Sequence, residues 1–127
     1  MDNFDMPNEV RFNLRPIPKP RMTQSDRWKK RPIVERYYRF KDELNRQSSA
    51  MNFVFPFSME LCFHLAMPKS WSVKKRNKYN GTYHQSKPDL DNLCKAVMDS
   101  MLTEDMQVYR INMTKYWSEE DYIIIRY

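Results

Sequence analysis

The sequence predicts an α+β fold: one small domain with a mixed or antiparallel sheet of about four strands and two main helices. The chain has 127 residues, enough for one modest hydrophobic core but hardly for two. Its periodic segments follow the order strand, helix, strand, basic loop, helix, strand, strand, which favours helices packed chiefly on one face of the sheet. We therefore expect a single domain over residues 1–127, with the polar, aperiodic residues 1–9 as a flexible arm.

The first half of the chain predicts a strand, an extended segment and a helix. Apolar residues alternate over 10–14, as in a half-buried strand. Pro16, Pro18 and Pro20 then prevent further regular pairing and favour an extended chain. A proline that suits a first helical turn, followed by an apolar and aromatic stripe at helical spacing, predicts a helix over 32–46.

The middle of the chain predicts a long strand and a short helix. Apolar residues alternate from 57 to 67, which predicts the strand. His64 has the opposite parity, so we expect it to face solvent without a catalytic role. Ser70 or Ser72 suits the start of a helix over 73–79, which the only glycine of the chain would end.

The last third predicts a second main helix and two strands. Helix is expected to begin between Asp89 and Asp91, because a proline precedes them and either aspartate suits the cap. Residues 106–117 favour a strand, and a short turn separates them from the β-prone residues 122–127. The short connection predicts an antiparallel hairpin. The apolar last strand would be prone to aggregation as an exposed edge, and pairing across a two-fold axis would cover it.

Composition narrows the class of protein. A net charge of +6 and a pI near 9.4 favour an acidic partner, most often nucleic acid. Cys62 and Cys94 lie in apolar stretches without metal-type spacing, which predicts buried reduced thiols. Since no apolar run has the length of a membrane span or a signal peptide, we expect a cytoplasmic protein without a membrane partner.

Two basic stretches are candidates for binding DNA phosphates. Residues 11–31 carry eight Lys or Arg against one acid, with a tryptophan among them. Residues 69–87 carry six Lys or Arg, several aromatics and no acid. Positive charge interleaved with aromatics suits a nucleic-acid backbone, and the alternative is a solvated basic loop. The predicted DNA-binding residues are Lys19, Arg21, Lys29, Lys30, Lys69, Lys74, Lys75, Arg76 and Lys87.

Acidic residues concentrate around the second main helix, in contrast with the rest of the chain. Asp91, Lys95 and Asp99 repeat every four residues and share one helix face, where a solvated ladder of ion pairs is the simplest interpretation. Glu104 and Asp105 follow the helix, where negative charge opposes the macrodipole. A hard cation such as Mg²⁺, which takes a few carboxylate oxygens and several waters, would favour the acids there.

The same residues carry a resemblance to a known family. The pattern D-x-D-N-L-x-K-A-x-x-D begins at Asp89, directly after Lys87-Pro88, and an acidic pair with Gln107-Val108 follows it. This arrangement resembles the signature of RusA-type Holliday junction resolvases, which are endodeoxyribonucleases. The resemblance extends more weakly to residues 18–21 and to Met67-Pro68, so it covers most of the chain.

The resemblance implies roles for particular residues. Asp89 and Asp91 match the two metal-binding aspartates of the motif, Lys95 matches its catalytic lysine, and Asp105 matches its third essential aspartate. The expected cofactor is Mg²⁺, with Mn²⁺ as a substitute. Asp99 is expected either to pair with Lys95 or to act as a ligand or a support for one. The resemblance also implies a RusA-like fold and a homodimer acting on a four-way DNA junction.

The prediction is therefore a Mg²⁺-dependent, structure-selective endodeoxyribonuclease that resolves Holliday junctions by paired symmetric nicks in DNA recombination and repair. Carboxylates near a DNA phosphate repel it, so a protein that only binds DNA would do better without them. A divalent ion held by the carboxylates turns this repulsion into attraction and can activate water, which favours an enzyme. Two alternatives stay open at this point. One is a catalytically inactive, basic nucleic-acid-binding protein, and the other is a metal-dependent nuclease acting on other DNA or on RNA.

Overall fold

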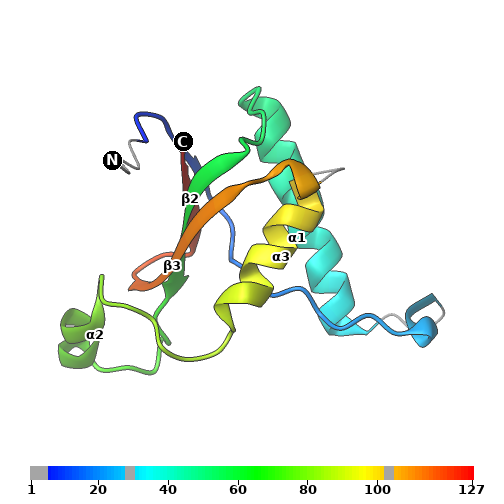
Figure 1. The fold of residues 1–127 in the computed structure, drawn as a ribbon. Helices are drawn as coiled ribbons and strands as arrows, with labels where there is room; N and C mark the ends of the chain where they lie inside the picture. The colour runs from blue at the N-terminus through cyan, green and yellow to red at the C-terminus, as the bar shows by residue number, and fades with distance from the viewer. Residues whose placement is uncertain (1–5, 28–30, 102–104) are drawn as a thin grey trace.

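The computed structural model describes residues 6–27, 31–101 and 105–127, except for the side chains of Arg27 and Asp105 (Figure 1). It has the predicted α+β architecture, with a four-stranded mixed sheet. The elements in chain order are β1 (Glu9–Phe12), the 3₁₀ helix η1 (Gln24–Arg27), α1 (Pro32–Ala50), β2 (Ser58–Ala66), α2 (Val73–Tyr79), α3 (Leu90–Met101), the 3₁₀ helix η2 (Asp105–Gln107), β3 (Arg110–Ser118) and β4 (Tyr122–Arg126).

The strand order in the sheet is β1-β4-β2-β3, and this corrects the predicted hairpin. β3 pairs with β2 in parallel, whereas β4 pairs antiparallel with both β1 and β2. The two last strands therefore lie on opposite sides of β2. The physical reason is burial: β2 and β4 carry side chains buried on both faces of the sheet, and such strands are most stable in its interior.

The position of β4 also corrects the expectation about an exposed terminal edge. Ile123, Ile124 and Ile125 lie on an interior strand whose neighbours are both present in the same chain. The edges of the sheet are β1 and β3. Covering β4 therefore requires no second copy of the chain.

The two main helices cover one face of the sheet. Met59, Leu61, Phe63 and Leu65 alternate along β2 and are buried in one core cluster with residues of α1 and α3. Figure 1 shows α1 and α3 side by side on the same side of the strands. The prediction of helices packed chiefly on one face is confirmed, and α3 is held on the sheet by its apolar stripe.

Helix boundaries agree with the predictions except at the end of α1. α2 has the predicted bounds, and the Ser72 hydroxyl accepts the N–H of Lys75 as its N-cap. α1 continues to Ala50 rather than ending near residue 46. The extra turn is stabilised by tertiary contacts, because the Gln47 amide both accepts from the N–H and donates to the carbonyl oxygen of Asn13.

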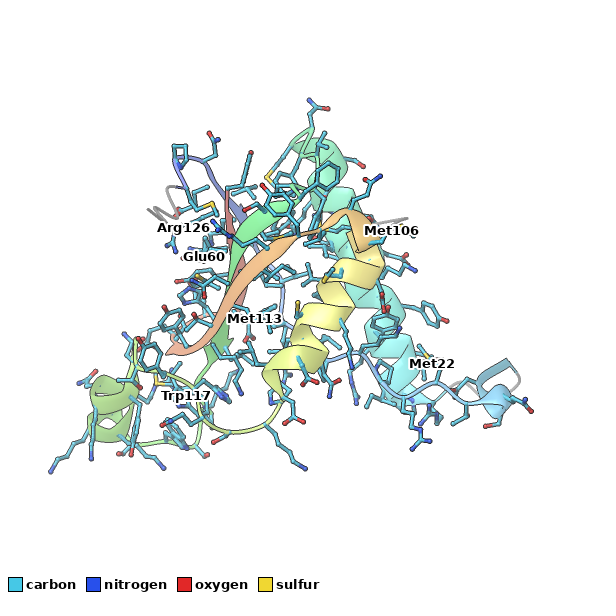
Figure 2. The ribbon with its side chains drawn as sticks, viewed as in Figure 1. Met22, Glu60, Met106, Met113, Trp117 and Arg126 are labelled. Carbon is cyan, nitrogen blue, oxygen red and sulfur yellow. The ribbon has the colours of Figure 1, made fainter. Side chains whose placement is uncertain are left out.

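The other face of the sheet is covered by long polar and aromatic side chains. Arg126 donates to the carboxylates of Glu9 and Glu60, and Figure 2 shows Glu60 and Arg126 next to each other. His64 does lie on this face but is half-buried, stacked between the rings of Tyr116 and Tyr122 at centroid distances of 5.1 and 4.1 Å.

Two predictions from composition are answered by the same structure. Cys62 and Cys94 are free and buried, as expected. Burial and the neighbouring Glu60 raise the pKa of the Cys62 thiol to about 11, which keeps it protonated. Over the described parts of the chain, every helix is too short or too polar to cross a bilayer.

Candidate active site

The first turn of α3 presents two aspartates to solvent. The Asp89 carbonyl oxygen accepts the N–H of Leu93 at 3.2 Å, which begins the helix. Leu93 and Val97 are buried in the core, so the helix is oriented by its apolar stripe. Asp89 and Asp91 are exposed at the end of the helix where the backbone N–H groups carry partial positive charge, which favours carboxylates.

The Asp89 carboxylate is not used to hold the structure together. Among the described residues it accepts no hydrogen bond and makes no ion pair within 4 Å, so it does not act as a side-chain cap. The negative charge of Asp89 acts on the Lys115 ammonium at longer range. The capping role that would explain an aspartate here is therefore not observed, and the carboxylate is available to a ligand.

Asp91 and Lys95 form the predicted i,i+4 pair, at 4.0 Å between Oδ2 and Nζ. About two-thirds of each side chain is exposed, 65% for Asp91 and 62% for Lys95. An ion pair so exposed and so long contributes little to stability. Both groups can therefore exchange this contact for a bound ion or a phosphate at small cost.

Asp99 pairs with Lys19 and not with Lys95, which corrects the expected ladder of three charges. The Lys19 backbone N–H also donates to the carbonyl oxygen of Asn92 at 3.0 Å. The proline-rich segment after β1 is thereby fastened along α3. Lys19 and Asp99 are far apart in the sequence, so helical periodicity alone could not identify this pair and assigned Asp99 to Lys95.

The third predicted aspartate lies beyond the other end of α3. Twelve helical residues with a rise of about 1.5 Å each separate the two ends by about 18 Å, and η2, which begins at Asp105, follows the far end. Figure 2 shows Met106 of η2 at that end of the helix. The Asp105 side chain and all of Glu104 fall outside what the structure describes, so their assignment stays a prediction.

The described residues suit a metal that needs few protein ligands. Among the described side chains, no group of three His, Cys, Asp or Glu residues is close enough to hold an ion. Mg²⁺ is commonly bound through one or two carboxylates, with water and substrate phosphate completing its shell. Asp89 and Asp91, exposed and two residues apart, fit that requirement.

A lysine that the sequence analysis did not single out holds the segment leading to Asp89. The Lys115 ammonium, on β3, donates to the carbonyl oxygens of Ser86 and Pro88 at 2.6 and 2.7 Å. Burial lowers the pKa of Lys115, and the negative charge of Asp89 acts in the opposite direction. No sequence pattern marks this residue, because its partners are main-chain carbonyls from a distant loop.

The outer edge of β3 fixes the rest of that segment. The Gly81 N–H donates to the Trp117 carbonyl oxygen and the His84 N–H to that of Lys115, so the chain after α2 runs along the edge strand. Gly81 has φ +80°, a conformation that glycine adopts without strain. The buried His84 ring packs on Trp117 at 3.8 Å between centroids. The lead-in to Asp89 is therefore anchored by both backbone and side chains.

α2, which precedes the segment leading to the acidic site, carries predicted DNA-binding residues. Aromatic packing holds the segment before α2 against β3, because the rings of Trp71 and Trp117 lie 4.8 Å apart between centroids. Arg76 is half-buried and pairs with Glu119, whereas Lys74 and Lys75 are exposed. In the view of Figure 1, α2 and the η1 region lie on either side of the start of α3. The exposed lysines of α2 are joined to that helix end by residues 80–89.

The other predicted DNA-binding residues have mixed positions. Arg21, Lys69 and Lys87 are exposed, whereas the Lys19 ammonium is engaged by Asp99. Lys29 and Lys30 fall outside the described residues. Asp26, the only acid of the first basic stretch, is bound by Arg31, and this contact lowers the pKa of its carboxyl to about 2.

Comparison with known proteins agrees with this site. A family model described as Endodeoxyribonuclease RusA matches residues 13–126, from just after β1 to the end of β4. Searches of curated proteins and of solved structures found no significant match. The matched region includes α3 with its two exposed aspartates and the whole path of the chain around them. The chain therefore belongs to the RusA family of endodeoxyribonucleases, which resolve Holliday junctions.

Proposed function

We propose that this protein is a Mg²⁺-dependent, structure-selective endonuclease that nicks four-way DNA junctions symmetrically, as part of recombination and repair. The observation that carries the proposal is the pair of exposed aspartates at the start of α3, inside a region matched to a resolvase family. The Asp89 carboxylate makes no hydrogen bond or ion pair with any described residue.

Asp89 and Asp91 are proposed to bind Mg²⁺, or Mn²⁺ in its place. The family resemblance also assigns Asp105 as a ligand, but η2 follows the far end of α3, about 18 Å away, so within one chain the two aspartates are the proposed ligands. Exposed carboxylates support this role, because a hard cation replaces their hydration with little rearrangement of the protein. When bound, such an ion polarises a phosphoryl oxygen and lowers the pKa of a coordinated water. The site would otherwise repel the phosphate it has to cut.

Lys95 is proposed to act on the scissile phosphate. Its ammonium lies one helical turn from Asp91, and among the described residues its one ion pair is the long, exposed contact with that aspartate. A cation so placed either stabilises negative charge that develops on the phosphate or orients the attacking water. Both roles need the ammonium to leave Asp91 when DNA arrives, which the weak pairing allows.

The basic surface is proposed to bring the DNA backbone to these carboxylates. The chain carries a net charge of +6, and its exposed Lys74, Lys75 and Lys87 belong to the segment that ends at Asp89. Phosphate contacts of this kind supply affinity without reading sequence. Selection of a branched substrate then depends on shape, which suits an enzyme that acts on junctions.

We further propose a homodimer. Paired nicks in two strands of a junction require two active sites, and each chain has one candidate site. A two-fold axis would place the sites on strands related by the symmetry of the junction. The family relationship and this geometric requirement support the dimer. The need to cover an exposed terminal strand does not, because β4 is already paired on both sides within the chain.

The decisive test is the Asp91→Asn variant in a junction-nicking assay with and without Mg²⁺. We expect junction binding to persist and nicking to fall by at least about a hundredfold, because several kcal/mol of transition-state stabilisation depend on the metal. Asp42→Asn is the matched control: it removes the same charge from an exposed position on α1 and should nick at the wild-type rate.

Near-normal nicking by Asp91→Asn would refute the metal assignment. Wild-type protein that binds junctions but never cuts them with Mg²⁺ would favour the inactive DNA-binding alternative. Equal cutting of a four-way junction, a linear duplex and RNA of matched length would instead indicate a nuclease with other substrates.

A further inference from the structure

A cavity adjoins the proposed metal site and has no role in the function described so far. Its volume is about 720 Å³, and Asp89 forms part of its wall. Leu65 at the end of β2, Ile33 on α1 and the prolines of the segment after β1 form an apolar floor. Cavities of this size are typical of sites that enclose a ligand the size of a nucleotide.

Three cations surround this floor, against the single carboxylate of Asp89. Arg15, Arg36 and Lys87 all line the cavity and are all exposed. Among the described residues, none of the three side chains makes a hydrogen bond or an ion pair. Two arginines outside the cavity are engaged by carboxylates, Arg31 by Asp26 and Arg126 by Glu60, whereas Arg21 and Arg39 are exposed like those at the cavity. The cations at the cavity are therefore available to a ligand.

The walls of the cavity are fixed by contacts already described. The segment after β1 is fastened to α3 through the Lys19 N–H and the Asn92 carbonyl oxygen, and Lys115 holds the carbonyl oxygen of Pro88. Pro16 is fully buried. Figure 1 shows the segment after β1 passing the start of α3 on its way to η1. The cavity is thus a built feature between three elements.

We propose that this cavity is a nucleoside subsite, which takes the unstacked base joined to the phosphate that is cut. The inference rests on the proposed function, because it places that phosphate at Asp89 and Asp91. A nucleotide linked to the phosphate reaches the cavity mouth, since Asp89 belongs to both sites. The aliphatic floor accepts the face of a base, and a planar guanidinium from Arg15 or Arg36 stacks on it or neutralises the next phosphate.

A branched substrate lowers the free-energy cost of placing a base in such a subsite. Extruding a base from a continuous duplex costs unstacking and unpairing, and that cost is least where pairing is already interrupted. Bases at the crossover of a four-way junction stay paired, but where the arms are splayed apart each lacks one stacking neighbour, which lowers the unstacking part of that cost. A base-accepting cavity next to the cut therefore favours junctions over linear DNA, and the Asn92 side chain in its wall offers a group for reading the base edge.

The test compares matched junctions that carry either a normal nucleotide or an abasic one directly 5′ or 3′ of the cut. We expect wild-type protein to nick the junction with the abasic residue on one of these sides roughly tenfold more slowly, as loss of one base contact implies. Arg36→Ala and Arg15→Ala should remove most of this difference. Lys41→Ala, which removes a positive charge from α1 outside the cavity, should leave the ratio unchanged.

A binding measurement without Mg²⁺ separates failure of the subsite from failure of the proposed function. A 2-aminopurine at the sensitive position should brighten when wild-type protein binds, because the cavity unstacks it, and should not brighten with Arg36→Ala. Equal nicking of normal and abasic junctions would overturn the subsite while leaving the nuclease intact. If no junction is cut at all, the proposed function fails, and an unchanged 2-aminopurine signal would overturn the subsite as well.

Discussion

His64 is held in its neutral form by its place on the open face of the sheet. Burial between two tyrosine rings is the first cause that lowers its pKa, and the positive charges of Arg11 and Arg126 add to it. The pKa of the buried His84 is lowered in the same direction, by burial and by Lys115. In the unfolded chain both imidazoles recover an ordinary pKa near 6.5.

The stability of the fold should therefore fall as pH drops below about 6.5. In that range the unfolded chain binds more protons than the folded one, so the free energy of unfolding rises with pH and levels off above it. His64→Phe keeps the stacked ring and removes the charge, so its stability should depend less on pH. Urea midpoints measured between pH 5.5 and 8 test this, and an unchanged slope in His64→Phe would contradict it.

The acidic residues of the chain differ in whether a neighbouring cation binds them. Asp99 binds Lys19, and Asp26 binds Arg31, so both acids are occupied by cations from their own surroundings. The Asp89 carboxylate has no such partner within 4 Å among the described residues. Carboxylates in ion pairs stabilise the local structure, whereas the Asp89 carboxylate at the start of α3 is available to bind a cation.

At the scale of elements, Lys115 connects β3 to the segment that carries Asp89. Its two hydrogen bonds come from a charged donor to main-chain carbonyls, and each bond of this kind contributes about 1.5–3 kcal/mol where it is buried. Because Lys115 is only half-buried, we expect Lys115→Met to lower the free energy of unfolding by about 1–2 kcal/mol in total. Nicking should fall as well, since Asp89 loses its support.

Chemical denaturation and the nicking assay measure the two effects of Lys115→Met. Lys41→Met is the control, because it makes the same replacement on α1 without losing a hydrogen bond to a described residue. Wild-type stability and nicking in Lys115→Met would show that the segment keeps its path without the ammonium.

At the scale of the whole molecule, one chain offers one candidate active site, and a junction has two strands to cut. We expect sedimentation equilibrium to give twice the 15.6 kDa mass of the chain. Mixing wild-type protein with excess Asp91→Asn should form heterodimers that cut one strand, so single nicks should replace paired cuts. A monomer that makes paired cuts would contradict the proposed assembly.

The apolar pattern of the sequence predicted most elements because it depends on local geometry. The period of two identified β2, the period near 3.6 identified α1 and α3, and a serine marked the start of α2. The acidic motif was also visible, since Asp89 and Asp91 are two residues apart on one turn. These properties need only neighbouring residues, so no knowledge of the rest of the fold was required.

Pairings between distant residues were decided by the tertiary structure alone. Hydrophobic alternation says which side chains of a strand are buried but not which strand lies beside it, so β4 between β1 and β2 was not predictable from its pattern. Asp99 pairs with Lys19, which lies 80 positions earlier in the sequence, and Lys115 bonds to Ser86, which lies 29 positions earlier. The sequence by itself determined the elements and the acidic motif, whereas long-range packing decided the strand order, the support of Asp89 and the cavity beside it.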